Sequence, residues 1–208
     1  MSYPAAKRVL DESIAVVLLV VLSPVFAFLF AAVGLDMAFR REDRGPWIYR
    51  ERRISRGREF DLLKFRTLRR DALATMHGES HARLLEADES NLTWPGRRIL
   101  KPWYLDELPQ LWNVLRGDMS LVGPRPWPPS MVAKQVVQGL TYREEFVAGW
   151  TGPAQVQKGA TETSGYAELD VAYVEAARAV GARTLLRMDL AILWKTVLVL
   201  ARGEGLQF

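Results

Sequence analysis

An apolar run near the N-terminus constrains this chain most, because it decides whether the chain meets lipid or water. Residues 14–35 read IAVVLLVVLSPVFAFLFAAVGL and contain no charged side chain. As a helix, these residues would extend about 33 Å, enough to cross a hydrocarbon core of about 30 Å. Length alone therefore predicts a transmembrane helix.

Two residues in the middle of this run, Ser23 and Pro24, predict a break in that helix. Pro24 has no N–H to donate to the carbonyl four residues earlier, and its ring crowds the preceding turn. Ser23 can donate its hydroxyl to a carbonyl that loses its helical partner. We therefore expect the segment to bend at these two residues.

Basic residues flank the run on both sides and bear on its orientation. Lys7 and Arg8 precede it, and Arg40, Arg41 and Arg44 follow it. Basic flanks favour the cytoplasmic side, so a bent helix that enters and leaves one leaflet keeps both clusters there. We expect a re-entrant helix-break-helix hairpin, with a kinked span as the alternative. A cleaved signal peptide fits less well, because its apolar region is usually only about 7–15 residues long.

Composition limits the remaining possibilities. The chain has 208 residues, enough for one domain with a modest core, and no cysteine, which excludes disulfides, thiolate nucleophiles and cysteine-based zinc sites. Residues 40–70 hold twelve Lys or Arg against five Asp or Glu, a local charge of +7 in a chain of net charge +4. Such a patch suits anionic lipid, a phosphate-bearing substrate or nucleic acid. We expect no nucleic acid as a partner, because no nucleic-acid-binding motif is present.

The pattern of apolar residues predicts a mostly helical α+β fold with a small β-hairpin. Strands are expected over residues 47–50, 59–65 and 119–122, with a turn at 55–57 between the first two. Helices are expected over residues 71–88, 107–116, 130–147, 166–180 and 183–201. The last of these helices is too charged to span a membrane, and we expect it to be an interfacial amphipathic helix or part of the core.

This pattern also predicts the domain organisation. Residues 1–40 are expected to form the re-entrant membrane helix, and residues 41–208 one continuous structural unit. His77 and His81 stand four residues apart on the expected helix 71–88, a spacing that suits two metal ligands. No third ligand with convincing spacing follows, so a solvated helix face is the favoured interpretation.

The adjacent acids Asp106 and Glu107, at the start of the expected helix 107–116, are the best candidates for chemistry. On the pattern alone they are a capping pair, stabilised by free N–H groups and the helix dipole. The catalytic alternative is that an aspartate attacks phosphorus, forming an acyl phosphate. Mg²⁺ favours one or two carboxylates together with substrate phosphates, which makes Glu107 a candidate ligand. Nearby, a proline-rich loop is expected to hold Arg125 in a defined position.

A longer motif then resembles a known family. Residues 105–126 read LDELPQLWNVLRGDMSLVGPRP, which is similar to the signature of bacterial sugar transferases, the monotopic polyprenyl-phosphate phosphoglycosyl transferases. Shorter matches lie in family order along the chain: Lys7-Arg8, Ser23-Pro24, Lys64-Phe65-Arg66-Thr67, Thr151-Gly152, Asp170 and Asp189. The size resembles the minimal catalytic unit of that family.

The resemblance implies a reaction. A UDP-sugar would donate its sugar-1-phosphate to polyprenyl (undecaprenyl) phosphate and release UMP, the first membrane step of bacterial glycan assembly. It implies Asp106 as the nucleophile and Glu107 as a catalytic ligand of the Mg²⁺ cofactor. It also implies five substrate-binding or active-site support residues: Lys64, Arg66, Lys101, Arg125 and Asp170. Lys101 stands where arginine is usual, which keeps the charge but loses bidentate geometry.

The resemblance further implies a monotopic protein on the cytoplasmic face of the bacterial inner membrane. Its partners would be the UDP-sugar donor, the polyprenyl phosphate acceptor and membrane lipids, and a homo-oligomer is left open. The alternative function, from another class, is an inactive membrane scaffold that recruits later glycosyltransferases. A scaffold of this kind would release no UMP with any donor.

Overall fold

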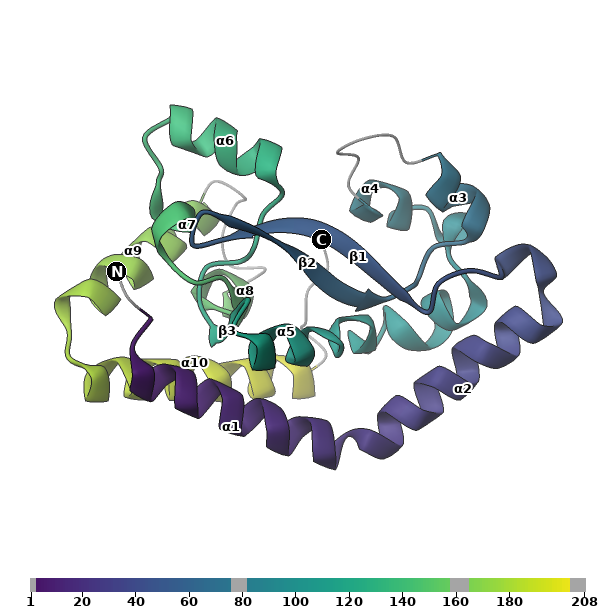
Figure 1. Ribbon diagram of the computed structural model, residues 1–208, viewed down its shortest axis with the longest axis horizontal. Helices are drawn as coiled ribbons and strands as arrows, with labels where there is room; N and C mark the ends of the chain where they lie inside the picture. Colours follow the sequence, from purple (N-terminus) through teal and green to yellow (C-terminus); the bar gives the residue numbers. More distant parts are fainter. Residues whose placement is uncertain (1–2, 76–81, 158–164, 203–208) are drawn as a thin grey trace. The chain divides into compact units, whose positions relative to one another are not determined.

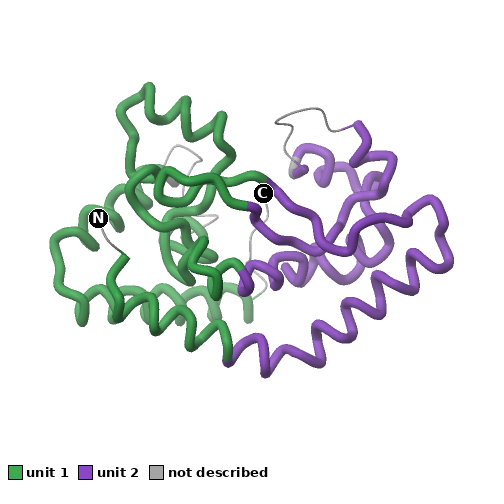
Figure 2. Tube along the Cα trace, in the orientation of Figure 1, with its two compact units in different colours: residues 1–16, 52–60, 113–208 green, residues 17–51, 61–112 purple. Residues whose placement is uncertain are grey.

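The computed structural model describes residues 3–75, 82–157 and 165–202 of the chain (Figure 1). The chain divides into two compact units, which Figure 2 distinguishes by colour. Unit 1 comprises residues 1–16, 52–60 and 113–208, and unit 2 comprises residues 17–51 and 61–112. The N-terminal helix and the β-hairpin each contribute residues to both units. The chain is not divided at residue 40, where the sequence predicted a domain boundary. The predicted domain organisation stays a prediction.

The N-terminal apolar segment forms two helices with a sharp bend between them. Helices α1 (Ala5–Val21) and α2 (Ser23–Phe39) meet at an angle of 61°. Pro24 lies in the first turn of α2, and the Ser23 hydroxyl donates to the carbonyl of Val20 at 2.8 Å. The predicted break and the predicted role of Ser23 are confirmed. Within the described ranges, no single helix has the length and apolar character of a membrane span, whereas this bent pair together does.

The predicted β-hairpin is present. Strands β1 (Ile48–Ser55) and β2 (Arg58–Phe65) are joined by Arg56 and Gly57, both with positive φ, 50° and 69°. Two-residue loops of this conformation match the right-handed twist of the flanking strands. The first strand is longer than predicted, since it continues from residue 50 to the turn at Arg56.

The rest of unit 2 consists of short helical turns. They are η1 (Arg41–Asp43), α3 (Arg70–Ala74), α4 (Ala82–Glu86), η2 (Glu89–Asn91), η3 (Gly96–Leu100, a π-helical turn), and η4 (Leu105–Glu107). A small core of Leu68, Ala72 and Ala82 packs with Leu85 and Leu92 and holds α3 and α4 to the hairpin. The expected helix 71–88 is represented by α3 and α4, while His77 and His81 lie outside the described residues.

Unit 1 contains a second, parallel sheet. Strand β3 (Ser120–Val122) was predicted, but its partner β4 (Gly149–Thr151) was not. Ser120 pairs with Gly149 and Val122 with Thr151. Besides the first part of α1, the described residues of this unit form six helices: α5 (Gln110–Arg116, shared with unit 2), α6 (Pro129–Val137), α7 (Tyr142–Glu145), α8 (Pro153–Val156), α9 (Gly165–Ala179) and α10 (Ala182–Ala201).

Most predicted helices of unit 1 are confirmed, with one correction. α9 and α10 match the expected helices 166–180 and 183–201. The expected helix 130–147 is wrong as one element, because the chain turns away at Gly139, whose φ is 84°. A left-handed glycine just after a helix is a common helix end.

A buried ion pair joins α1, β3 and α10 within unit 1. The Lys7 ammonium donates to Asp189 at 2.5 Å and to the carbonyl of Val122 at 3.0 Å. Figure 1 shows α10 beside the N-terminal half of α1, as these contacts require. Lys7 is therefore a packing residue, and of the basic residues that precede the apolar run only Arg8 is at the surface. The N-terminal flank carries less surface charge than the sequence indicated.

Candidate active site

Asp106 and Glu107 lie in the one-turn 3-10 helix η4, within unit 2. The residue before this turn, Tyr104, has a left-handed backbone with φ of 54°. Left-handed conformations are costly for residues other than glycine, and they cluster at functional sites. Helix α5 begins only at Gln110, so the expected start of a helix at Glu107 with Asp106 as its N-cap is wrong. The capping interpretation of the two acids loses its support.

The Asp106 carboxylate is buried beneath a lysine. Only 3% of its side chain is exposed, and the Nζ of Lys101 lies 3.6 Å from its Oδ2. The Lys101 side chain is 33% exposed and therefore reaches solvent. The ammonium is thus placed beside the carboxylate and within reach of solvent.

A second lysine, Lys64 on β2, joins the other acids of the site. Its Nζ lies 3.6 Å from Glu107 Oε1 and 3.7 Å from Glu51 Oε2. All three side chains are mostly buried. The structure thus brings four predicted site residues together in unit 2: Lys64, Lys101, Asp106 and Glu107.

Sequence reasoning missed two residues of this cluster: Glu51 on β1 and, at the end of α4, Glu86. Its carboxylate accepts hydrogen bonds from Lys101 Nζ and from Thr67 Oγ1, each at 2.6 Å. Thr67 belongs to the Lys64–Thr67 motif, but no spacing or motif pointed to Glu86. Only the packing of α4 near the strand end brings the glutamate to Lys101.

The local environment shifts the pKa values of two of these acids in opposite directions. Burial raises the pKa of Asp106 to about 6; the Lys101 ammonium lowers it and the Glu107 carboxylate raises it. Burial also raises the pKa of Glu86, but the ammonium groups of Lys101 and Lys64 and two hydrogen bonds lower it by more. The net pKa of Glu86 is therefore below its ordinary value.

The donor set of the cluster fits a cation bound together with an anionic substrate. Four carboxylates (Glu51, Glu86, Asp106, Glu107) and two ammonium groups (Lys64, Lys101) give a formal charge of −4 + 2 = −2. A diphosphate would be repelled by this charge unless a divalent cation accompanied it. No cluster of three potential metal-ligating side chains occurs among the described residues. The expected Mg²⁺, with Glu107 as one ligand, stays a prediction.

Arg66, two residues after Lys64, is buried, and its guanidinium binds backbone carbonyls. Its guanidinium donates to the carbonyls of Pro46 at 2.9 Å, Leu68 at 3.1 Å, and Asp43. These bonds hold the chain after η1 against the end of β2. Contact between Arg66 and a donor phosphate would require these bonds to be exchanged, and it stays a prediction.

Arg125 and Asp170 belong to unit 1, where Arg143 links them. Arg143 donates to Asp170 Oδ2 at 2.8 Å and to the Arg125 carbonyl at 3.0 Å, and its guanidinium lies 4.1 Å from the centre of the Trp127 ring. Burial raises the pKa of Asp170 to about 6, although Arg143 opposes the shift. Arg143 was missed because it stands in the charged run YREE, which is typical of a solvated surface.

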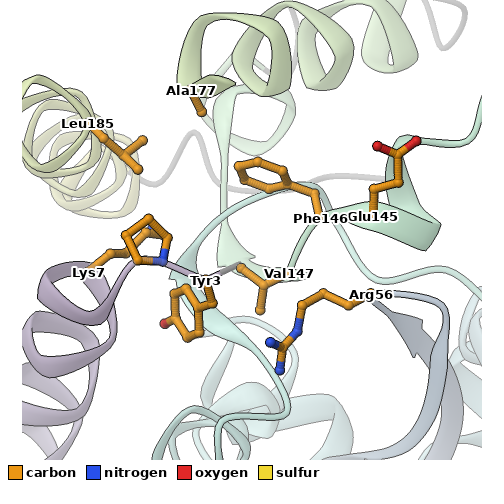
Figure 3. A pocket seen from close by; sticks show the side chains of 9 residues that line it. Tyr3, Lys7, Arg56, Glu145, Phe146, Val147, Ala177 and Leu185 are labelled. Atoms are coloured by element: carbon orange, nitrogen blue, oxygen red, sulfur yellow. The ribbon is translucent and has the colours of Figure 1, made fainter. Parts of the chain in front are cut away.

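Unit 1 also contains a small pocket, shown in Figure 3, in which Tyr3 and Arg56 face each other. Its volume is about 20 Å³, close to the space of one water molecule. None of the predicted substrate-binding residues lines it, and it is too small for a sugar nucleotide. We assign no part of the chemistry to this pocket.

Comparison with known proteins identifies the family. The profile described as bacterial sugar transferase matches residues 2–203. The chain belongs to the bacterial sugar transferase family. The predicted resemblance is therefore confirmed over nearly the whole chain.

Several curated relatives support this assignment. The uncharacterized sugar transferase EpsL of Bacillus subtilis is 37% identical over 207 residues, 97% of this chain and 90% of its own length. A UDP-glucose:undecaprenyl-phosphate glucose-1-phosphate transferase of Caulobacter vibrioides is 40% identical over 76% of this chain and 56% of its own. An undecaprenyl-phosphate galactose phosphotransferase of Salmonella typhimurium is 33% identical over 96% of this chain. The chain spans only 41% of that Salmonella protein.

Proposed function

We propose that this bacterial sugar transferase moves a sugar-1-phosphate from a UDP-sugar to polyprenyl phosphate through a covalent intermediate on Asp106. Two relatives whose names describe transfer to undecaprenyl phosphate support the reaction class. The observation that carries the proposal is the position of Asp106, a buried carboxylate next to Glu107 and 3.6 Å from the Lys101 ammonium. Such a carboxylate is suited to attack phosphorus once a cationic group neutralises the substrate.

The proposed reaction has two displacements at one phosphorus atom. A carboxylate oxygen of Asp106 bonds to the phosphorus that carries the sugar, and the bond from that phosphorus to the UMP oxygen breaks. A phosphate oxygen of polyprenyl phosphate then bonds to the same phosphorus, and the bond to Asp106 breaks. Lys64 and Lys101 neutralise negative charge at the phosphate oxygens in both steps.

Mg²⁺ would be held by Glu107 and substrate phosphates, where it supplies additional positive charge for the leaving UMP. Lys101 donates to a phosphate of the sugar donor when the substrate binds. The formal charge of −2 on the six-residue cluster favours a donor that is accompanied by a divalent cation. Burial keeps water away from the acyl phosphate, which water would otherwise hydrolyse.

We propose that the protein is monotopic, on the cytoplasmic face of the bacterial inner membrane. The bent pair α1–α2 fits a re-entrant segment, and the apolar residues Val16, Val17, Val20 and Val21 are exposed on α1. α10 also leaves large apolar side chains exposed: Leu190, Trp194, Val197 and Leu200. Their spacing of three to four residues forms one stripe, which is typical of a helix lying in the membrane interface. A polyprenyl tail would remain in lipid while its phosphate reached the site.

A donor screen tests the reaction. The purified full-length protein is incubated in detergent micelles with Mg²⁺, undecaprenyl phosphate and one UDP-sugar at a time, and UMP is quantified. We expect UMP release that depends on the acceptor with at least one donor. Absence of UMP release with every donor, in a folded preparation, would favour the scaffold function instead.

A further inference from the structure

Glu86 makes two short hydrogen bonds in the six-residue cluster of unit 2. Oε1 accepts from the Thr67 hydroxyl at 2.6 Å, and Oε2 accepts from the Lys101 ammonium at 2.6 Å. Each carboxylate oxygen therefore has its own donor. The side chain is mostly buried, so these bonds are little screened by solvent.

Thr67, whose hydroxyl donates to Glu86, is itself held in place by backbone contacts. The backbone carbonyl of Thr67 accepts from the N–H and the hydroxyl of Thr93, at 2.8 and 3.1 Å. Gly96, the first residue of the π-helical turn η3, packs against the same Thr67 carbonyl. A Cβ at this position would lie only 2.5 Å from the carbonyl oxygen, so a side chain would clash there. Glu86 is thus anchored to packed backbone on one side and to Lys101 on the other.

The Lys101 ammonium lies near two carboxylates, those of Glu86 and Asp106. Its Nζ lies 2.6 Å from Glu86 Oε2 and 3.6 Å from Asp106 Oδ2. A lysine side chain is flexible and its ammonium has three rotatable donors, so a close partner is needed to fix its position. The shorter, charge-assisted bond shows that Glu86 fixes the ammonium and that Asp106 does not.

We propose that Glu86 is a positioning residue for the transfer reaction: it holds the Lys101 ammonium beside Asp106 and keeps it from pairing closely with that carboxylate. The inference rests on the proposed function. Asp106 is thereby left to attack phosphorus, while the remaining donors of Lys101 are directed to the phosphate of the sugar donor. Glu86 acts on the reaction only through Lys101.

The substitution Glu86→Gln removes the charge and keeps the shape. The nearest acid for Lys101 is then Asp106, and the ammonium closes onto the nucleophile. We expect kcat to fall by about 100-fold, because a shift of about 1 Å at reacting groups can cost that much. The KM for the UDP-sugar is expected to stay within about threefold, since the loss concerns the transfer step.

Matched variants separate this role from a loss of folding. Glu89→Gln removes the same charge at an exposed position three residues away, and wild-type kcat is expected. Glu86→Asp retains the charge and is expected to recover part of kcat. Thr67→Val removes only the hydroxyl that holds Glu86, so we expect kcat to fall by less than in Glu86→Gln. This variant tests the proposal even if Glu86→Gln does not fold.

A double-mutant cycle with Lys101→Met gives the decisive result. If Glu86 acts through Lys101, Glu86→Gln changes kcat by less than about threefold once Lys101 is replaced. An equal loss of kcat in both backgrounds would overturn the proposal. A large rise in the Mg²⁺ concentration required by Glu86→Gln would also overturn it, because Glu86 would then be a metal ligand.

The outcome for wild type separates the two proposals. Lack of UMP release by folded wild-type protein would contradict the proposed function. Normal UMP release by wild type together with normal kcat for Glu86→Gln would contradict only the positioning role of Glu86.

Discussion

The ammonium of Lys101 lies 3.6 Å from Oδ2 of Asp106, whose side chain is only 3% exposed. The lysine is therefore a counter-charge for the proposed nucleophile. Burial of the carboxylate would protect the acyl phosphate of the proposed reaction from water between the two displacements. The same ammonium can neutralise phosphate oxygens of the donor, and this leads to the first prediction.

Replacing Lys101 should slow transfer more than it weakens donor binding. We expect Lys101→Met to lower kcat by about 100-fold, because neutralisation of the phosphate oxygens is lost in the transition state. Lys101→Arg keeps the charge, so a smaller loss is expected. Lys134→Met, at an exposed position on α6, is the control for loss of a lysine. Wild-type kcat in Lys101→Met would contradict the assigned role.

Glu107 is predicted to act through the metal. Glu107→Gln should raise the Mg²⁺ concentration needed for half-maximal UMP release by at least about tenfold, because a carboxylate ligand is lost. UMP release is measured over a Mg²⁺ series in parallel with Glu89→Gln. An unchanged Mg²⁺ response in Glu107→Gln would refute the ligand assignment.

Asp170 is predicted to make stability depend on pH. Its pKa is raised from 3.8 to about 6 by burial, so between these values the folded state binds more protons than the unfolded state. Stability from this group is therefore greatest below about pH 4 and falls as pH rises through about 6. Relative to Asp170→Asn, the wild-type free energy of unfolding should fall by about 3 kcal/mol over this window.

Denaturant unfolding in detergent at several pH values measures this difference. Asp71→Asn, at an exposed position, is the control for loss of one aspartate. A difference between wild type and Asp170→Asn that is constant from pH 4 to pH 7 would show that Asp170 is not shifted.

The chain offers a direct test of the re-entrant topology, because it contains no native cysteine. Ala6→Cys and Glu42→Cys place single thiols at exposed positions before α1 reaches the apolar run and after α2. In sealed inverted membrane vesicles, whose cytoplasmic face points outwards, both thiols should react with an impermeant maleimide. Labelling of only one of them would establish a kinked span.

The sequence predicted elements whose causes are local. The bend follows from Ser23 and Pro24, and the hairpin from the turn at Arg56 and Gly57. The parallel pairing of β3 and β4 was missed, because two three-residue strands separated by 26 residues leave no local signal. The prediction of one long helix over 130–147 followed the apolar periodicity. It is wrong because the chain turns away at Gly139.

The candidate site was predictable only in part for the same reason. The pair Asp106 and Glu107 stood out in the sequence, although both lie in a 3-10 turn after the left-handed Tyr104 and not at a helix cap. Glu86 and Arg143 could not be found, because their partners are set by tertiary packing. Charged residues in polar runs look like solvated surface until the fold buries them.

The covalent intermediate on Asp106 is the central claim, and intact-protein mass spectrometry tests it most directly. Wild-type protein is mixed with Mg²⁺ and the active UDP-sugar without acceptor, quenched and weighed, with Asp106→Asn and Asp88→Asn alongside. We expect a mass increase of one sugar phosphate in wild type and Asp88→Asn, located by peptide mapping to Asp106, and none in Asp106→Asn. An adduct that persists in Asp106→Asn, or rapid acceptor-dependent turnover by that variant, would contradict it.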